Sequence, residues 1–395
     1  MADRSQNSSI AIRKEVTSGV FNAPTASDVV VIGDLRITPA PITSELNEYT
    51  GTIHRPGEVL VGQTIEVSGK AYLRGPGGTT VPAADAWIPG RLLQAVGFTE
   101  VRQASAIGPE AVATGTTTSV TLGAAAAATN DLYRGMFVDL VSALGGTRPR
   151  RLAMIQAYSA AKVATLAETL PAAYSSGQYS IPAQLSYQLS PASDPPTLSI
   201  VGSVGGKRYQ MAGMAPTTFR FNMPTASRDQ QEPPNIEFTL SGKIVDVVDD
   251  VPLVGTPNVT PPPFRNGKMF VNRVALGGSS FTVDLNAETS FAPNANELDG
   301  YETGLLTRTT RRVDMTLNQV ANSVIDLAGL AEAQTLLPIL GQWGIGSGNS
   351  FGMLIPSARI FTPAPDISGP LITNTVQAVI DGANKDIVLA IPFYV

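Results

Sequence analysis

The chain of 395 residues is longer than one hydrophobic core usually supports, so about two or three domains are expected. It has no cysteine and a single histidine, His54, which excludes disulfides, thiolate sites and histidine clusters for transition metals. A net charge of -5 argues against a protein that grips nucleic acid phosphates. Only 15% of residues are charged, so we expect a surface that is covered by other subunits or, in a secreted protein, by glycans.

No apolar run approaches the ~20 residues that span a bilayer. The amino terminus lacks the apolar core of a signal peptide. We therefore expect a protein that is made and kept in a cytosol, with no membrane partner.

Alternation of apolar and polar residues dominates the chain and predicts half-buried antiparallel strands. The clearest runs are 28–38, 63–73, 217–223, 235–247, 279–288 and 311–320. Two other segments have helical spacing. The first is 83–98, with Asp85 as candidate N-cap and Gly97 as terminator. The second is 324–344, in which Pro338 is expected to cause a kink or break.

Two short stretches nearly repeat each other, ELNEYTG at 45–51 and ELDGYETG at 297–304. Each is followed by a polar connection, a strand and one of the two predicted helices. A strand, a proline-rich connection and another strand come later in both cases. The sequence therefore predicts a mainly β fold of two homologous antiparallel β-sandwich lobes, each with one flanking helix.

The domain organisation follows from this repeat. The first lobe is predicted over 1–106 and 184–250, and the second over 268–395. The proline-rich segment 251–267 suits an extended linker between them. Residues 107–183 have no counterpart in the second lobe, and their short apolar runs between turns predict a small inserted all-β module.

No pattern in the sequence favours catalysis, a cofactor or a metal. Asp246, Asp249 and Asp250 lack the glycine-containing spacing of a calcium loop and are expected to end a strand. The stretch GSVGGKR at 202–208 lacks P-loop spacing and predicts a tight hairpin turn. The basic stretch RPRR at 148–151 is either a surface turn or a patch that meets an acidic neighbour.

Several stretches together resemble the major tail tube proteins of bacteriophages with long, non-contractile tails. They are SGVFNAPTASDVVVIGDLRITP at 18–39, ELNEYTGT at 45–52, AWIPGRLLQAVGF at 86–98, and the pair of segments 197–223 and 233–246. The inserted segment is similar to a small β-module that recurs in phage virion proteins. Its usual Gly-Gln-x-Arg turn reads GGTRPRR at 145–151 here.

The resemblance implies a structural virion protein whose lobes assemble around an axis, so that inner strands form a continuous lumen wall. Rings stack into a tube, and viral DNA passes through it without specific binding. A chain with two lobes implies a trimeric ring of pseudo-sixfold symmetry, with a hexamer as the alternative. The implied partners are further copies of the chain, the tape measure protein and the tail terminator. The inserted module is expected to project outward, and the subunit is expected in the phage tail after assembly in the host cytoplasm.

The resemblance also assigns the candidate site. Two long loops, 47–62 and 299–310, correspond to a loop that reaches the neighbouring ring in the family. The candidate ring-stacking residues are Glu45, Leu46, Tyr49, Arg55, Leu298, Tyr301 and Arg308. The simpler interpretation is that both are solvated loops.

Other functions stay open at this point. A tail terminator would cap the tube, and a capsid decoration protein would also be structural. A β-rich adhesin would bind glycans, although the inserted segment has no tryptophan for an aromatic platform. A polysaccharide-degrading enzyme would need a carboxylate or histidine constellation that the sequence does not reveal.

Overall fold

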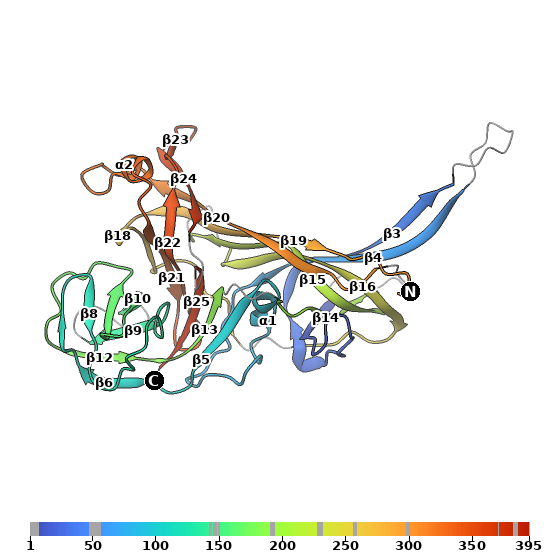
Figure 1. Ribbon diagram of the computed structural model, residues 1–395, viewed down its shortest axis with the longest axis horizontal. Helices are drawn as coiled ribbons and strands as arrows, with labels where there is room; N and C mark the ends of the chain where they lie inside the picture. The colour runs from blue at the N-terminus through green and yellow to red at the C-terminus, as the bar shows by residue number, and fades with distance from the viewer. Residues whose placement is uncertain are drawn as a thin grey trace.

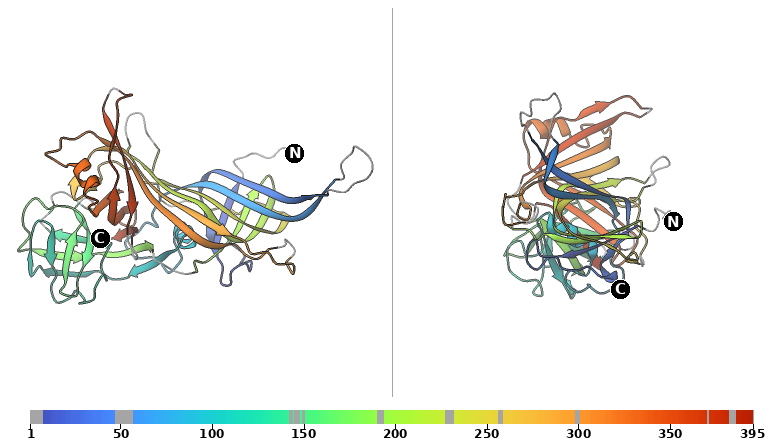
Figure 2. Two further views of the ribbon diagram at one scale, coloured as in Figure 1. Left: turned by 45° about the horizontal axis from the view of Figure 1, so that its top comes forward. Right: turned by 90° about the vertical axis from the view of Figure 1, so that its right-hand side faces the viewer.

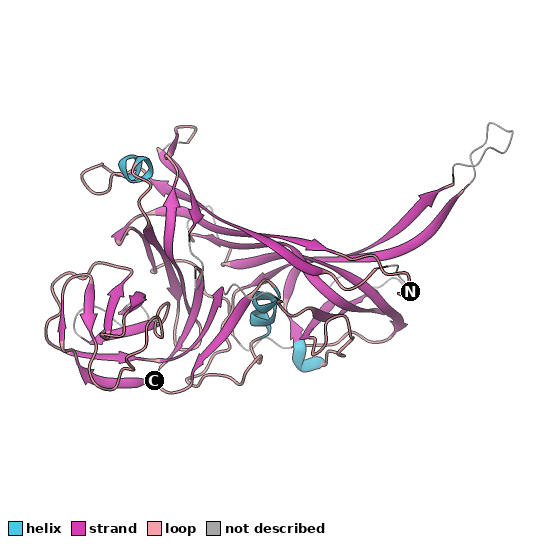
Figure 3. Ribbon diagram, in the orientation of Figure 1, coloured by secondary structure: helices cyan, strands magenta, loops and turns pink. Residues whose placement is uncertain are grey.

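The computed structural model describes residues 8–46, 57–141, 144, 148, 151–189, 194–226, 232–255, 259–297, 301–369, 371–381 and 386–394. Over these residues the chain is built from large antiparallel sheets and contains two short α-helices, which lie far apart (Figure 3). The predicted mainly β fold is confirmed.

The elements fall into three groups along the chain, named here the first half, the inserted module and the second half. The first half contains β1 (Ser9–Lys14), β2 (Val29–Val30), β3 (Ile32–Glu45), β4 (Glu58–Tyr72), α1 (Ile88–Ala95), β5 (Phe98–Gln103), β13 (Ala183–Leu189), β14 (Leu198–Val204), β15 (Lys207–Pro224) and β16 (Asn235–Asp249). The inserted module contains β6 (Ile107–Ala111), β7 (Thr114–Gly115), β8 (Ser119–Thr121), β9 (Phe137–Val141), β10 (Leu152–Tyr158), β11 (Val163–Leu166) and β12 (Gln178–Ile181). The second half contains β17 (Lys268–Val271), β18 (Val274–Ala275), β19 (Gly278–Ser290), β20 (Leu305–Asn318), α2 (Leu327–Glu332), β21 (Leu337–Gly344), β22 (Ser350–Ile360), β23 (Ala364–Asp366), β24 (Thr373–Ile380) and β25 (Val388–Phe393).

Strands of the two halves pair in the same order. In the first half, neighbouring strands run β2, β1, β14, β15, β16, β4 and β3. In the second half they run β18, β17, β21, β22, β24, β20 and β19. Each strand in one series takes the same place along the chain as its counterpart in the other. The chain therefore follows the same path through its sheet in both halves.

The correspondence extends to the strand pairs of the two long hairpins, β3–β4 and β19–β20, and from Arg36–Ser68 onward it holds pair by pair. A constant difference of 246 residues relates their strand pairs, since 278 minus 32 and 317 minus 71 are both 246. The matching pairs are Ile32–Ala71 with Gly278–Leu317, Arg36–Ser68 with Thr282–Asp314, and Thr43–Leu60 with Thr289–Leu306. A β-bulge also interrupts each hairpin at the same place, after Ile42 and after Glu288. Bulges re-aim a strand, so a shared bulge position is a specific feature of both hairpins.

Direct strand pairing joins the two halves. Arg220–Pro224 of β15 pairs with Ser280–Asp284 of β19, which we name the internal seam. It makes one continuous sheet in the order β3, β4, β16, β15, β19, β20, β24 and β22–β23 (Figures 1 and 2). A second junction pairs β25 of the second half with β13 of the first.

Alternation along these strands places the core on one face of the continuous sheet. The inward side chains are almost fully buried, as the period of two along a strand requires. Examples from successive strands are Val67, Phe238, Phe221, Val283 and Met315. Both helices and both tryptophans, Trp87 and Trp343, belong to this core or its border.

The helices are shorter than the sequence predicts. Helix α1 begins after Trp87, with Pro89 in its first turn, where the missing N–H costs nothing. The predicted N-cap Asp85 is therefore wrong, whereas Gly97 at a φ of +101° does follow the helix end. In the second segment only Leu327–Glu332 is helical, and Leu337–Gly344 is the buried strand β21. The predicted helix over 324–344 is confirmed at 327–332 and is wrong beyond it, because a short apolar run fits a buried strand as well as a helix.

The inserted module has its own sheet and its own core. Its strands pair only with one another, in the order β6, β12, β9, β10, β11, β8 and β7. One face of the module packs on the second half, where Phe137 and Met154 meet Leu340 and Leu354. Contact is so close that a Cβ on Gly352 would lie 2.4 Å from Met154 Sδ. The module is therefore anchored on the second half, and its expected outward position in an assembly stays a prediction.

A buried ion pair connects the module to the second half. Lys268 Nζ lies 2.7 Å from Glu168 Oε1 and donates to the carbonyl oxygen of Leu152 at 2.8 Å. Glu168 is 2% exposed and Lys268 is 9% exposed. Burial raises the pKa of Glu168, and the ammonium group of Lys268 opposes that rise.

Removing one partner of this pair should cost much more than replacing both. Lys268→Met leaves the Glu168 carboxyl buried without its cation, and we expect the free energy of unfolding to fall by about 3–5 kcal/mol. The double variant Lys268→Met with Glu168→Leu should stay within about 1 kcal/mol of the wild type, because apolar replacement of a buried pair is often neutral. Urea unfolding measures both. Equal losses in the single and double variants would contradict the role given to the pair.

Candidate assembly interface

The two predicted ring-stacking loops are shorter than expected. Residues 58–62 belong to β4 and residues 305–310 belong to β20, so those parts of the loops are strand. Glu45 is the last residue of β3, Leu46 directly follows it, and Arg308 lies within β20. Tyr49, Arg55 and Leu298 lie outside the described residues.

Tyr301 is buried within the chain, which corrects its predicted role in ring stacking. Its side chain is 6% exposed, and its hydroxyl donates to the carbonyl oxygen of Gln63 at 2.9 Å. The ring packs edge-on against Phe291, and Lys243 Nζ lies 5.2 Å from its centre. Lys243 also forms an ion pair of 3.0 Å with Glu297. Tyr301 therefore docks the end of the second hairpin on the first half.

In the described part of the first hairpin, residues 42–45 and 58–62 pair only with each other. Beyond the body of the molecule, β3 and β4 continue as a two-stranded arm (Figure 1). Four aliphatic side chains on this arm are at least 42% exposed: Ile42, Val59, Leu60 and Val61. An isolated two-stranded ribbon is marginally stable in water, so an arm of this kind gains from a covering surface.

Both ends of the continuous sheet are open. Among the described strands, β3 pairs only with β4, and β23 pairs only with β24. Open edges present unpaired backbone groups that invite another strand. The sequence carries a signal for these edges, because prolines at 39, 41, 363 and 365 follow the alternation typical of edge strands.

The face of the continuous sheet opposite the core is polar, and several cations on it are paired with carboxylates. The distances are 2.9 Å for Lys70–Glu232, 3.4 Å for Lys70–Glu237 and 3.2 Å for Arg312–Asp314, and Arg220 also pairs with Asp284 across the internal seam. Hydrogen bonding to Glu232 raises the pKa of Lys70, and hydrogen bonding to Asp284 raises the pKa of Arg220. The charges of this face therefore largely neutralise one another.

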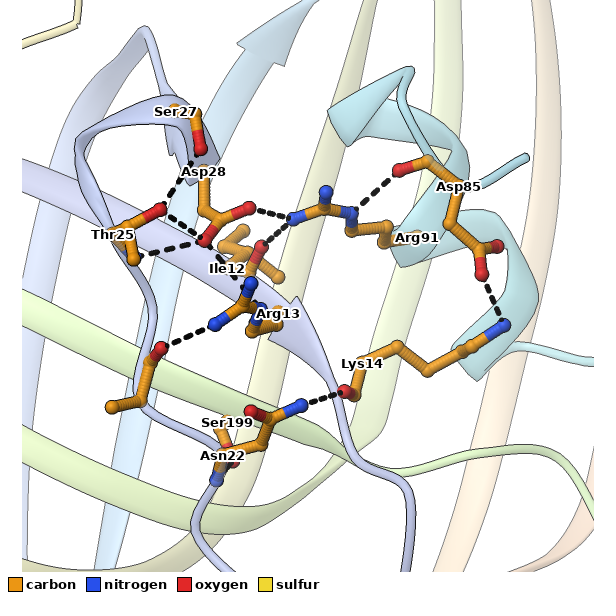
Figure 4. A network of polar contacts seen from close by, with 11 residues as sticks. Ile12, Arg13, Lys14, Asn22, Thr25, Ser27, Asp28, Asp85, Arg91 and Ser199 are labelled. Carbon is orange, nitrogen blue, oxygen red and sulfur yellow. Dashed lines mark hydrogen bonds and ion pairs between the residues drawn. The ribbon is translucent and has the colours of Figure 1, made fainter. Parts of the chain in front are cut away.

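A cluster of titratable groups forms a structural network around α1 (Figure 4). Arg91 donates to Asp28 at 2.7 Å and to the carbonyl oxygen of Ile12 at 2.6 Å. Lys14 Nζ lies 2.7 Å from Asp85 Oδ2. These bonds tie the helix to β1 and to the turn before β2, and Asp28 and Asp85 each already have a cation.

The basic stretch at 148–151 meets an acid of its own module. Arg148 and Arg151 both lie 2.7 Å from Asp139, which is 1% exposed. Hydrogen bonding to Asp139 raises the pKa of Arg151. Arg148 also lies over the ring of Tyr394, near the end of the chain, at 5.3 Å.

Two further predictions concern strand ends. The tight turn within 202–208 is present, since Val204 pairs with Lys207 and both intervening glycines have positive φ. The acidic residues Asp246 and Asp249 lie at the end of β16, and Asp250 follows it. Over the described ranges, no group of three or more acidic or histidine side chains is placed to hold a metal ion.

Comparison with models of known protein families and with curated protein sequences gives no match. Within the described part of the chain, no helix is long and apolar enough to cross a bilayer. The candidate site therefore rests on geometry: two open sheet edges, a projecting arm and a polar, self-paired sheet face.

The Asp28–Arg91 contact predicts a pH dependence of stability. Burial alone would raise the pKa of Asp28, but hydrogen bonds from Thr25 and Arg91 outweigh it and lower that pKa below 3.8. The stabilisation is therefore complete above pH 3.8 and is lost as the pH falls through the lowered value.

Asp28→Asn should reduce the free energy of unfolding by about 1–3 kcal/mol at pH 7, since it removes hydrogen bonds to a charged group. The difference from the wild type should shrink below pH ~3. Urea unfolding at a series of pH values measures it, with the exposed Asp34→Asn as control. A difference that stays constant down to low pH would contradict the assignment.

Proposed function

We propose that this chain is a structural subunit that assembles with copies of itself into closed rings, which stack into a tube of the phage tail tube type. The observation that carries the proposal is the internal seam between β15 and β19. One unit of the continuous sheet consists of β3, β4, β16 and β15, and the next consists of β19, β20, β24 and β22–β23. The seam joins the last strand of the first unit to the first strand of the second, and both units have the same pairing order. Such a head-to-tail contact can repeat from copy to copy, and it closes into a ring when the rotation allows.

The two halves are homologous lobes in this proposal. Support comes from the matched strand order and from hairpin registers that differ by a constant 246 residues, bulge included. Two unrelated sheets have no reason to share a bulge position. Three chains then supply six equivalent units to one ring, which gives a trimer with pseudo-sixfold symmetry. A hexamer of chains would be the alternative.

The polar face of the continuous sheet lines the lumen in this proposal. Several cations there are paired with carboxylates, for example Lys70 with Glu237 and Arg312 with Asp314. A wall of threonine, serine and self-paired charges offers phosphates few free cations, so DNA slides without being held. The implied partners are the tail terminator, which would cap the tube, and the tape measure protein.

The arm of β3 and β4 connects one ring to the next. Its exposed aliphatic side chains Ile42, Val59, Leu60 and Val61 would be covered by the neighbouring ring. This assigns stacking to the strand part of the arm, next to the predicted residues Glu45 and Leu46.

Assembly of the purified chain tests the proposal directly. Mass photometry over a concentration series should show monomers giving way to a species of three times the 41.3 kDa chain mass. Negative-stain images should then show rings with a central hole and, at the highest concentrations, stacks. A chain that stays monomeric at every concentration would contradict the proposal.

Leu60→Asp should separate ring formation from stacking. The side chain is 61% exposed, so the change should leave folding intact and place a charge in the surface that stacks. We expect rings of normal mass and a loss of stacked particles in negative-stain images. Val16→Asp, at a residue that is 92% exposed on the body, is the matched control and should stack normally. Normal stacking by the Leu60 variant would show that the arm does not join rings.

A further inference from the structure

We propose that β3 of one copy pairs with β23 of the next copy, with Arg36 directly opposite Asp366. This rests on the proposed function and deepens it, because it names the surface and register that close the ring. The partner is a second copy of this chain. The internal seam is the template for the seam between chains.

Each open edge of the sheet is equivalent to one strand of the internal seam. Strand β3 corresponds to β19 at a difference of 246 residues. Strands β22 and β23 correspond to β15 at a difference of 144, as their partner strands show. The matching pairs are Pro216–Leu240 with Ile360–Ala378, Arg220–Glu237 with Ala364–Thr375, and Asn222–Asn235 with Asp366–Thr373. A register shift lies between 216 and 218, and a matching one-residue offset lies between 360 and 364.

The register of the seam transfers in the same way. Thr282 of β19 pairs with Asn222 of β15. Subtracting 246 from 282 gives Arg36, and adding 144 to 222 gives Asp366. The neighbouring pairs become Leu35 with Ile367, Ile37 with Pro365 and Thr38 with Ala364.

Backbone direction agrees with this register. Thr225 N donates to the carbonyl oxygen of Ser279, so alternate β15 residues Phe221 and Met223 face β19. Their counterparts are Pro365 and Ile367, which therefore face the open edge of β23. Pro365 cannot donate there, but its carbonyl oxygen can accept from Ile37 N–H.

Prolines also end the seam at the right place. Pro39 and Pro41 alternate with Ile37 along β3, so they face the same open edge and offer it no N–H. The internal seam stops at Asp284, whose counterpart on β3 is Thr38. A slip of two residues would set Pro39 opposite Pro365, a pair with no donor at all. The prolines therefore disfavour a slip in this direction.

Burial supports the same contact. Met223, the counterpart of Ile367, is fully buried at the internal seam, whereas Ile367 is 76% exposed. Leu35 and Ile37 are only partly buried at the border of the main core. Pairing of β3 with β23 would cover these side chains and continue the core from one chain to the next.

Charge supports it as well. Arg36 and Asp366 are both exposed, and no carboxylate of the described residues forms an ion pair with Arg36. Asp366 accepts hydrogen bonds from the backbone and the side chain of Ser368, and it forms no ion pair with a cation of the described residues. The proposed pair repeats the role of Arg220 and Asp284, which bridge the internal seam. Opposite charges directly across an antiparallel pair are favourable, and like charges are not.

A charge swap tests the register. Arg36→Asp and Asp366→Arg each place like charges opposite one another in every seam, and each should raise the concentration at half assembly by about tenfold or more. The double variant restores opposite charges and should assemble close to the wild-type concentration. Arg102→Asp, an exposed arginine of β5, is the matched control, and circular dichroism checks that all variants fold. Single variants that assemble normally, or a double variant as impaired as the singles, would overturn the pairing.

Disulfide trapping provides the second test, since the wild-type chain has no cysteine. A mixture of Arg36→Cys and Asp366→Cys chains should give covalent dimers and nothing larger on oxidation. The double cysteine variant should give a ladder that ends at the number of chains in the ring. Arg36→Cys with Pro365→Cys is the control, because the second side chain points to the opposite face.

The outcomes separate the two proposals. Rings that form in the wild type but do not cross-link at these positions would overturn the β3–β23 seam and leave the tube subunit standing. Absence of any wild-type assembly would overturn both.

Discussion

An open sheet edge is the constraint on which the rest of this structure depends. Backbone N–H and C=O groups along an edge need partners, and a long β chain must cover, close or pair them. Here an edge strand of the first half pairs with an edge strand of the second half at the internal seam. The combined sheet still ends in two open edges, β3 and β23. The same chemistry that joins the halves is thus left unsatisfied at both ends of the molecule.

Other features of the fold make that sheet rigid enough to serve as a repeating unit. The second hairpin is held on the first half by Tyr301, and β25 returns to pair with β13. The inserted module leaves the chain after β5 but packs on the second half, with the buried Lys268–Glu168 pair at the contact. A seam between copies needs a constant angle between the halves. Each of these three contacts connects parts of the chain that would otherwise be held together only by the internal seam.

Much of the sheet was predictable from the sequence, because alternation of apolar and polar residues marks each long strand. Register was not predictable. The repeated stretches that begin at Glu45 and Glu297 lie 252 residues apart, whereas equivalent residues of the two hairpins lie 246 apart. The repeated stretches therefore do not occupy equivalent positions. Bulges and pairings depend on contacts between distant segments, which single-sequence patterns do not contain.

The candidate site was likewise predictable from the sequence only in part. Long polar connections after two strands indicated the right hairpins, yet Tyr301 is buried because the second hairpin folds back on its own chain. Helical spacing in 324–344 also misled, since buried strand and buried helix have similar apolar runs. The open edges had a usable signal in the alternating prolines, which lack the N–H that an interior strand must donate.

The central claim is that the contact between the two halves of one chain recurs between chains. A cryo-electron microscopy map of the assembled particle, at a resolution that separates strands, tests it most directly. The account predicts one uninterrupted sheet around the ring, in which the junction between chains superimposes on the β15–β19 junction within each chain. A particle whose chains meet through other surfaces, with β3 and β23 facing solvent, would contradict it.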